Sequence, residues 1–177
     1  MTDFKNRMLR AAKLDVSLYE EVEADKGATT QAMVVVMLSS VAAGIGSVGS
    51  GGVGGIVFGT VAALVGWYVW AYLTYFIGTR FLPEADTDAD HGELLRTIGF
   101  SSAPGLIRVA GIIPGLVTVA FSVAGIWMLA AMVIGVRQAL DYKSTLRAFG
   151  VCLIGWVIQA LILVIVFAIF GGGVKGV

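Results

Sequence analysis

Residues 27–79 read GATTQAMVVVMLSSVAAGIGSVGSGGVGGIVFGTVAALVGWYVWAYLTYFIGT, a run of 53 residues without Asp, Glu, Lys or Arg. A helix needs about 20 apolar residues to cross the ~30 Å hydrocarbon core of a bilayer, so this run has room for two crossings and a turn. The turn is indicated by GIGSVGSGGVGG at 44–55, which is too rich in glycine for a stable helix interior. We therefore predict membrane-spanning helices over about 31–49 and 55–78.

The composition of the whole chain also indicates a membrane protein. Of its 177 residues, 58% are hydrophobic and 14% are charged, against about 25% charged in soluble domains. Twelve Lys and Arg balance twelve Asp and Glu, so no net field attracts nucleic acid. A single cysteine, Cys152, excludes an intramolecular disulfide, and a single histidine, His91, excludes a metal site built on two histidines. We expect one all-α domain over 1–177, an integral membrane helical bundle.

Two further stretches, 109–136 and 148–174, carry no charge, and each is long enough for one crossing. We place these spans at about 115–136 and 148–171.

The segment 95–113 is short for a crossing, is interrupted by Pro104 and contains Arg108. If it crosses and the N-terminus is cytoplasmic, ten Lys and Arg residues lie inside and Lys175 alone lies outside. Without this crossing, three of the ten move outside. Because positive charge gathers on the cytoplasmic side, we predict five transmembrane helices, the third broken near Pro104 by its missing backbone donor.

The polar segment 1–28 is expected to form an amphipathic surface helix, or two, on the cytoplasmic face. Apolar residues recur at three- and four-residue spacing between its Lys and Arg residues. Ser17 with Glu20, and Asp90 with Glu93 further on, match the capping box that starts a helix. The segment either anchors the first span or docks a partner.

Small residues at four-residue spacing predict close helix packing in lipid. Gly51, Gly55 and Gly59 repeat the G-x-x-x-G pattern, and Ala42 with Gly46 has the same spacing. These residues pack either the first two spans against each other or one subunit against another.

Three polar or helix-breaking residues inside the spans are candidate functional residues: Arg108, Pro104 and Gln159. Arg108 has no Asp or Glu in any span to pair with, and intramembrane charges are costly and usually functional. It either reaches the membrane surface, caps carbonyl groups freed by Pro104, or binds a ligand or a lipid headgroup. Gln159 is expected to make an interhelical hydrogen bond or to contact a substrate.

Several motif matches are given structural interpretations. The sequence at 44–49 fits G-x-G-x-x-G, but it follows a membrane span, and no acidic residue occurs before Glu84. The loop at 84–93 imitates a calcium site, yet its glycine is one position late and the closing glutamate is missing, so we expect a solvated acidic loop with His91 at its end.

WYVWAYLTYF at 67–76 is typical of an aromatic belt at the headgroups. No catalytic constellation, metal site or cofactor site is predicted.

The chain resembles prokaryotic members of the Yip family, the Ypt/Rab-interacting membrane proteins. The resemblance lies in AAKLDVSLYEEVEAD (11–25), GTRFLPEADTDADHGELLRTIGFSSAPGLIRVAGIIPGL (78–116) and GIWMLAAMVIGVRQALDY (125–142). It implies five spans, a cytoplasmic N-terminus and, for the bacterial branch, the cytoplasmic membrane. The eukaryotic DLYGP-type motif is absent, so the resemblance does not extend to a Rab-type GTPase partner.

Two functions are compatible with these features. The first is a non-enzymatic scaffold or organiser that associates with membrane lipids, other membrane proteins or further copies of itself. The second is a small oligomeric transporter or channel subunit, because discontinuous helices with a charge line transport sites and Arg108 lies in such a segment.

Overall fold

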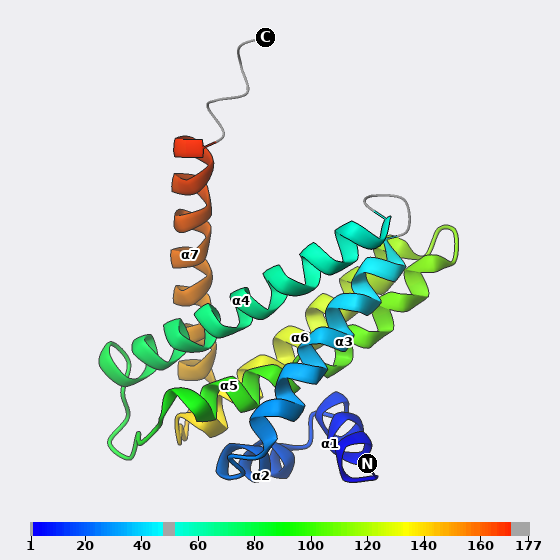
Figure 1. Cartoon of the computed structure of the whole chain (residues 1–177). Coiled ribbons are helices and arrows are strands. Elements are labelled where there is room, and N and C mark those ends of the chain that lie inside the picture. Colours follow the sequence, from blue (N-terminus) through cyan, green and yellow to red (C-terminus); the bar gives the residue numbers. More distant parts are fainter. Residues whose placement is uncertain (1, 48–51, 171–177) are drawn as a thin grey trace.

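The computed structural model describes residues 2–47 and 52–170, and the helices in these ranges form one bundle (Figure 1). Four helices are long and apolar enough to cross a membrane, the last of them over Thr145–Ile162 of its length. The described ranges thus have the all-helical architecture of a membrane bundle expected from the charge-free stretches. These four helices are α3 (Ala28–Gly46), α4 (Gly52–Arg80), α6 (Val117–Ala139) and α7 (Thr145–Phe170).

The segment expected as the third crossing consists of two short helices. α5 (His91–Phe100) and the 3-10 helix η1 (Ala103–Ile112) each have 10 residues and are joined by Ser101 and Ser102. Neither is long enough to cross alone. At a rise of 1.5 Å per residue for an α-helix and 2.0 Å for a 3-10 helix, the two together extend about 35 Å. Five crossings therefore require α5 and η1 to act as one pass.

The polar loop after α4 and the loop between α6 and α7 meet at one end of the bundle, which we call the basic end. The backbone N–H of Lys143 donates to Glu84 Oε2 at 2.9 Å. The hydroxyl of Tyr142 donates to the carbonyl oxygens of Gly78 at 2.9 Å and Leu82 at 2.7 Å. Since α5 and η1 leave this end and α6 returns to it, the two short helices run along the bundle beside α6 (Figure 1).

Two short helices, α1 (Thr2–Ala12) and α2 (Val16–Ala24), lie across the basic end (Figure 1). The side chain that caps α2 is Asp15, which accepts from the Ser17 backbone N–H at 3.1 Å, so the capping box expected at Ser17 is wrong. The box at the start of α5 is confirmed. α2 is more than a surface helix, because its Leu18, Tyr19 and Val22 side chains are fully buried against the bundle.

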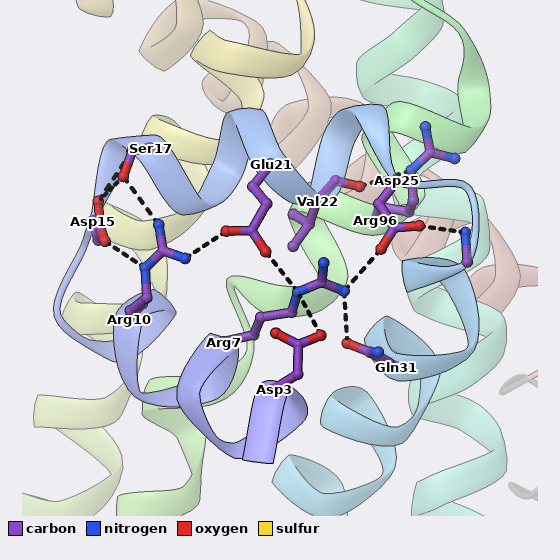
Figure 2. A network of polar contacts seen from close by, with 11 residues as sticks. Asp3, Arg7, Arg10, Asp15, Ser17, Glu21, Val22, Asp25, Gln31 and Arg96 are labelled. Atoms are coloured by element: carbon purple, nitrogen blue, oxygen red, sulfur yellow. Dashed lines mark hydrogen bonds and ion pairs between the residues drawn. The ribbon is translucent and has the colours of Figure 1, made fainter. Parts of the chain in front are cut away.

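An ionic network fastens α1 to α2 and α3 (Figure 2). Arg7 pairs with Glu21 at 2.8 Å and with Asp25 at 2.9 Å, and it donates to Gln31. Arg10 pairs with Glu21 at 2.5 Å. Both carboxyls have a pKa below the ordinary value. Hydrogen bonds from Arg10 and, to a smaller extent, Arg7 lower the pKa of Glu21, and a hydrogen bond from Arg7 lowers that of Asp25.

A second contact ties α2 to α5. The guanidinium of Arg96 donates to the backbone carbonyl of Val22 (Figure 2). It also donates to the carbonyl of Glu23, at the end of α2 where helix carbonyls lack partners. The side chain of Glu23 is partly buried here. Burial, and then the nearby charges of Asp141 and Glu93, raise its pKa to about 8.

Helices α3 and η1 approach each other through backbone atoms. A Cβ on Gly46 would stand 1.9 Å from the carbonyl oxygen of Arg108, and one on Gly111 would stand 2.6 Å from the carbonyl oxygen of Gly46. Gly99 in α5 is equally close to α3, since its Cβ would stand 2.7 Å from Ala32. Only glycine permits such a short distance between two helix backbones. Gly46, whose spacing from Ala42 predicted close helix packing, therefore packs against η1.

The described members of the other small-residue pattern do not pack helices of this chain together. Gly51 lies outside the described residues. Gly55 and Gly59 are exposed, and a Cβ on either would meet no atom within 4 Å. Packing of one subunit against another through this pattern stays a prediction.

Helix α7 is packed along its first half. Its buried side chains include Ala148, Val151 and Cys152 near its start, and Gly155 faces the Trp70 ring, which would lie 3.1 Å from a Cβ. Beyond this point the described side chains are exposed or half-buried, with Leu161 exposed to 57%.

Candidate functional site

A cavity of about 720 Å³ lies between α3, α4, α6 and α7, with the α5–η1 junction at its base. It is open where exposed residues of α4 and α7 form its wall, and we call it the lateral groove. Four glycines widen it, since a Cβ on Gly55, Gly59, Gly66 or Gly125 would meet no atom within 4 Å. The groove has the size of a small-molecule site, and its wall is mainly apolar with a few polar groups.

The one charged residue in the wall of the groove is Arg108 on η1. Its Nε donates to the Gly105 carbonyl at 3.0 Å, and one Nη donates to the Ser39 hydroxyl at 2.6 Å and to the Ser39 carbonyl at 3.2 Å. Its guanidinium carbon also lies 6.0 Å from the centre of the Phe121 ring, within cation–π distance. Arg108 thus donates to the carbonyls of Gly105 and Ser39, which are not the carbonyls freed by Pro104 that one of the sequence interpretations expected.

The glycine at position 105 makes room for this arrangement. A Cβ there would stand 2.1 Å from the Ser39 hydroxyl oxygen and 2.6 Å from an Nη of Arg108. Pro104 precedes it, buried in the first turn of η1, where its missing N–H removes no helix hydrogen bond. Pro104 therefore shapes the start of η1 and is not among the residues lining the groove.

Gln159 lies on α7, is exposed, and lines the groove. Within the described ranges its amide makes no hydrogen bond to another helix, contrary to expectation. The structure therefore brings Arg108 and Gln159, residues from distant parts of the sequence, to the same cavity.

Two tryptophans expected in an aromatic belt form the inner end of the groove. Trp70 is exposed to only 7%, and its indole N–H points to Met132 Sδ at 3.1 Å. The indole N–H of Trp67 donates to the Leu95 carbonyl at 3.0 Å. The belt interpretation is therefore wrong for Trp70, while Tyr68 and Tyr72 are exposed.

The acidic loop makes structural contacts. Asp86 pairs with Lys143, whose hydrogen bond lowers the pKa of the carboxyl, and Asp90 caps α5. His91 begins α5 as expected but is half-buried: its ring lies edge-on to Tyr68 at 4.9 Å, and its buried Nε2 has no hydrogen-bond partner among the described residues. In the described ranges, no three His, Cys, Asp or Glu side chains gather to hold a metal ion.

Sequence reasoning identified Arg108 and Gln159 but missed the groove and the residues that shape it. Ser39 belongs to a buried stripe of α3 that continues through Ala42 to Gly46, a spacing of three and four residues. This periodicity marks the face of α3 that packs inward. The glycines that widen the groove carry no such signal, because the same spacing predicts helix contacts.

Four long apolar helices and a buried polar junction define the class of the protein as an integral membrane protein of the helical type. The chain belongs to the Yip1 family: the family model described as the Yip1 domain matches residues 17–168. The match covers α2 to α7 and confirms the resemblance to the Yip family. Comparisons with curated proteins and with solved structures gave no match.

Proposed function

We propose that the protein is a non-enzymatic membrane scaffold or organiser that takes up a component of the bilayer in the lateral groove. The observation that carries this proposal is the position of the groove between helices that face lipid. Its wall combines open glycines with the polar side chains of Arg108 and Gln159. Small residues facing lipid provide close contact with a bound molecule, since burial of apolar surface does not drive association inside a bilayer.

Site-specific photocrosslinking tests this proposal. A photoreactive phenylalanine analogue in place of Trp156 keeps an aromatic ring in the wall of the groove, whereas the same analogue at the neighbouring Val157, which is 54% exposed, does not line the groove. The proposal predicts a discrete crosslinked species, lipid or protein, from position 156 alone. Equal crosslinking from both positions would mean that the groove holds only bulk lipid.

We further propose five crossings, with the basic end in the cytoplasm and the bundle in the bacterial cytoplasmic membrane. Support comes from the combined length of α5 and η1 and from the loops that join at the basic end. With Cys152 replaced by serine, cysteines are introduced at Asp88 and at Ile113, at opposite ends of the α5–η1 pass. From outside sealed cells, an impermeant thiol reagent is expected to label position 113 and not 88. Labelling of both or of neither would contradict a single pass.

A second candidate function is a small oligomeric transporter or channel subunit. The observation that favours it is the place of Arg108 on a short helix that lines a cavity, as in discontinuous helices at transport sites. Flux into liposomes that is lost on Arg108→Ala would support this function. Flux equal to that of the wild type would leave it without its main residue.

A further inference from the structure

Arg108 is a cation without a counter-ion. In the described ranges, no carboxylate lies within ion-pair distance of its guanidinium, although Arg7, Arg10 and Arg147 each have such a partner. The neutral groups of Gly105 and Ser39 accept from its Nε and one Nη. The other Nη makes no hydrogen bond within these ranges. An unpaired charge away from water is costly, so an anion in the groove would stabilise this arrangement.

The groove matches an amphiphile better than a small ion. Its volume of about 720 Å³ far exceeds that of a phosphate group, and most of its wall is apolar. The open glycines of α4 leave a wide space beside Arg108, and Trp67 and Trp70 form an apolar inner end. The amide of Gln159 adds a polar group on the wall contributed by α7. A molecule with an anionic head and an apolar tail would satisfy both parts.

We propose that the lateral groove binds an anionic glycerophospholipid, with its phosphate on the free donors of Arg108 and an acyl chain along Gly55 and Gly59. This inference rests on the proposed function and names the component that the groove takes up. The charge complementarity is direct, since the two N–H groups of the remaining Nη can donate charge-assisted hydrogen bonds to phosphate oxygens. Ser39 and Gly105 act as positioning residues, because they hold the guanidinium in place.

Quenching of tryptophan fluorescence by brominated lipids measures this binding. The chain has four tryptophans, and Trp127→Phe with Trp156→Phe leaves Trp67 and Trp70 at the inner end of the groove. The full chain is reconstituted into vesicles with brominated phosphatidylglycerol or brominated phosphatidylcholine. Both lipids offer a phosphate, but the choline cation offsets the negative charge in phosphatidylcholine, whereas phosphatidylglycerol stays anionic. We therefore expect phosphatidylglycerol to bind about ten-fold more tightly.

Two charge variants test the role of Arg108. Arg108→Gln is expected to abolish the preference for phosphatidylglycerol. Arg80→Gln removes the same charge from an exposed position outside the groove and is expected to keep the preference. An unchanged preference in a folded Arg108→Gln protein, an equal loss in Arg80→Gln, or no preference in the wild type would each overturn the inference.

A third variant, Gly59→Leu, decides the matter if Arg108→Gln does not fold. No atom lies within 4 Å of a Cβ at position 59, so the side chain fills the groove without disturbing the bundle. It is expected to reduce quenching by both lipids, and unchanged quenching would overturn the inference. Loss of the preference on adding inorganic phosphate would also overturn it, in favour of a soluble anion. A protein crosslinked from position 156, together with no lipid preference, would refute this inference and leave the proposed function intact.

Discussion

Replacement of Gly46 by alanine tests the backbone contact between α3 and η1. The added Cβ would stand 1.9 Å from the carbonyl oxygen of Arg108, whereas a carbon–oxygen contact needs roughly 3.4 Å. The two helices would have to separate locally by about 1.5 Å. No side chain can rotate to relieve the clash, because the opposing atom belongs to the backbone and the carbonyl of Gly46 is itself packed at Gly111.

The expected cost follows from overpacking. Extra atoms in a well-packed core cost typically 1–3 kcal/mol, and a clash between backbones belongs at the upper end, about 3 kcal/mol. Alanine regains about 1 kcal/mol through its better helix propensity. The net destabilisation is about 2 kcal/mol, which lowers the Tm of a chain of this size by about 4–8 °C.

Thermal unfolding of purified protein in a neutral detergent measures this shift. Gly59→Ala is the matched control, because it has the same propensity gain inside a helix and no atom within 4 Å of the new Cβ. Its Tm is expected to equal or exceed that of the wild type. If Gly46→Ala and Gly59→Ala unfold at the same temperature, α3 and η1 do not meet through their backbones, and the groove lacks the support described above.

Three further outcomes are expected at the basic end. Acidification should release α1, because the pKa values of Glu21 and Asp25 are lower in the folded state than in the unfolded state. The stability that these carboxylates contribute is present above their unfolded-state pKa and is lost as pH falls through their folded-state pKa. Hydrogen exchange of α1 measures this loss. Glu23→Gln should raise the Tm at pH 8 and leave it nearly unchanged at pH 4, because the raised pKa of Glu23 makes its ionisation destabilising as pH rises from its unfolded value toward about 8. Tyr142→Phe should lower stability by about 1–3 kcal/mol in denaturant unfolding, because it removes the one O–H donor that the Gly78 and Leu82 carbonyls share.

Each of these expectations has a contradicting result. Protection of α1 that is independent of pH would show that apolar packing, and not the ionic network, holds this helix. A Tm gain from Glu23→Gln that is equal at pH 4 and pH 8 would separate the effect from ionisation. An unchanged unfolding midpoint for Tyr142→Phe would mean that water replaces the hydroxyl at no cost.

Much of the bundle could be predicted from the charge gaps, because the bilayer excludes charge over a fixed length. The expected span of 55–78 corresponds to Gly52–Arg80, and that of 115–136 to Val117–Ala139. The Asp90 and Glu93 capping box was also readable, since it depends on two side chains three residues apart. Helix capping and the length of a span each depend on a short stretch of sequence, so both can be predicted without knowing the fold.

The long-range arrangement could not be predicted in the same way. The spacing of Gly55 and Gly59 is identical to that of packed glycines, yet these residues widen a cavity, because the neighbouring helices lie elsewhere. Ser39 receives its role from Arg108, which is distant in the sequence. The close approach of η1 to α3 at Gly46 is likewise encoded by no local pattern.

Because α7 is attached to the bundle only along its first half, its second half can tilt as a rigid helix. The last close contact is that of Gly155 with Trp70, and the helix beyond it, to Phe170, is about 22 Å long at 1.5 Å per residue. A tilt of about 10° about this contact moves the end of α7 by about 4 Å and Gln159, about 6 Å beyond the contact, by about 1 Å. The width of the groove beside α7 can thus change while the contacts among α3, η1 and α6 are kept.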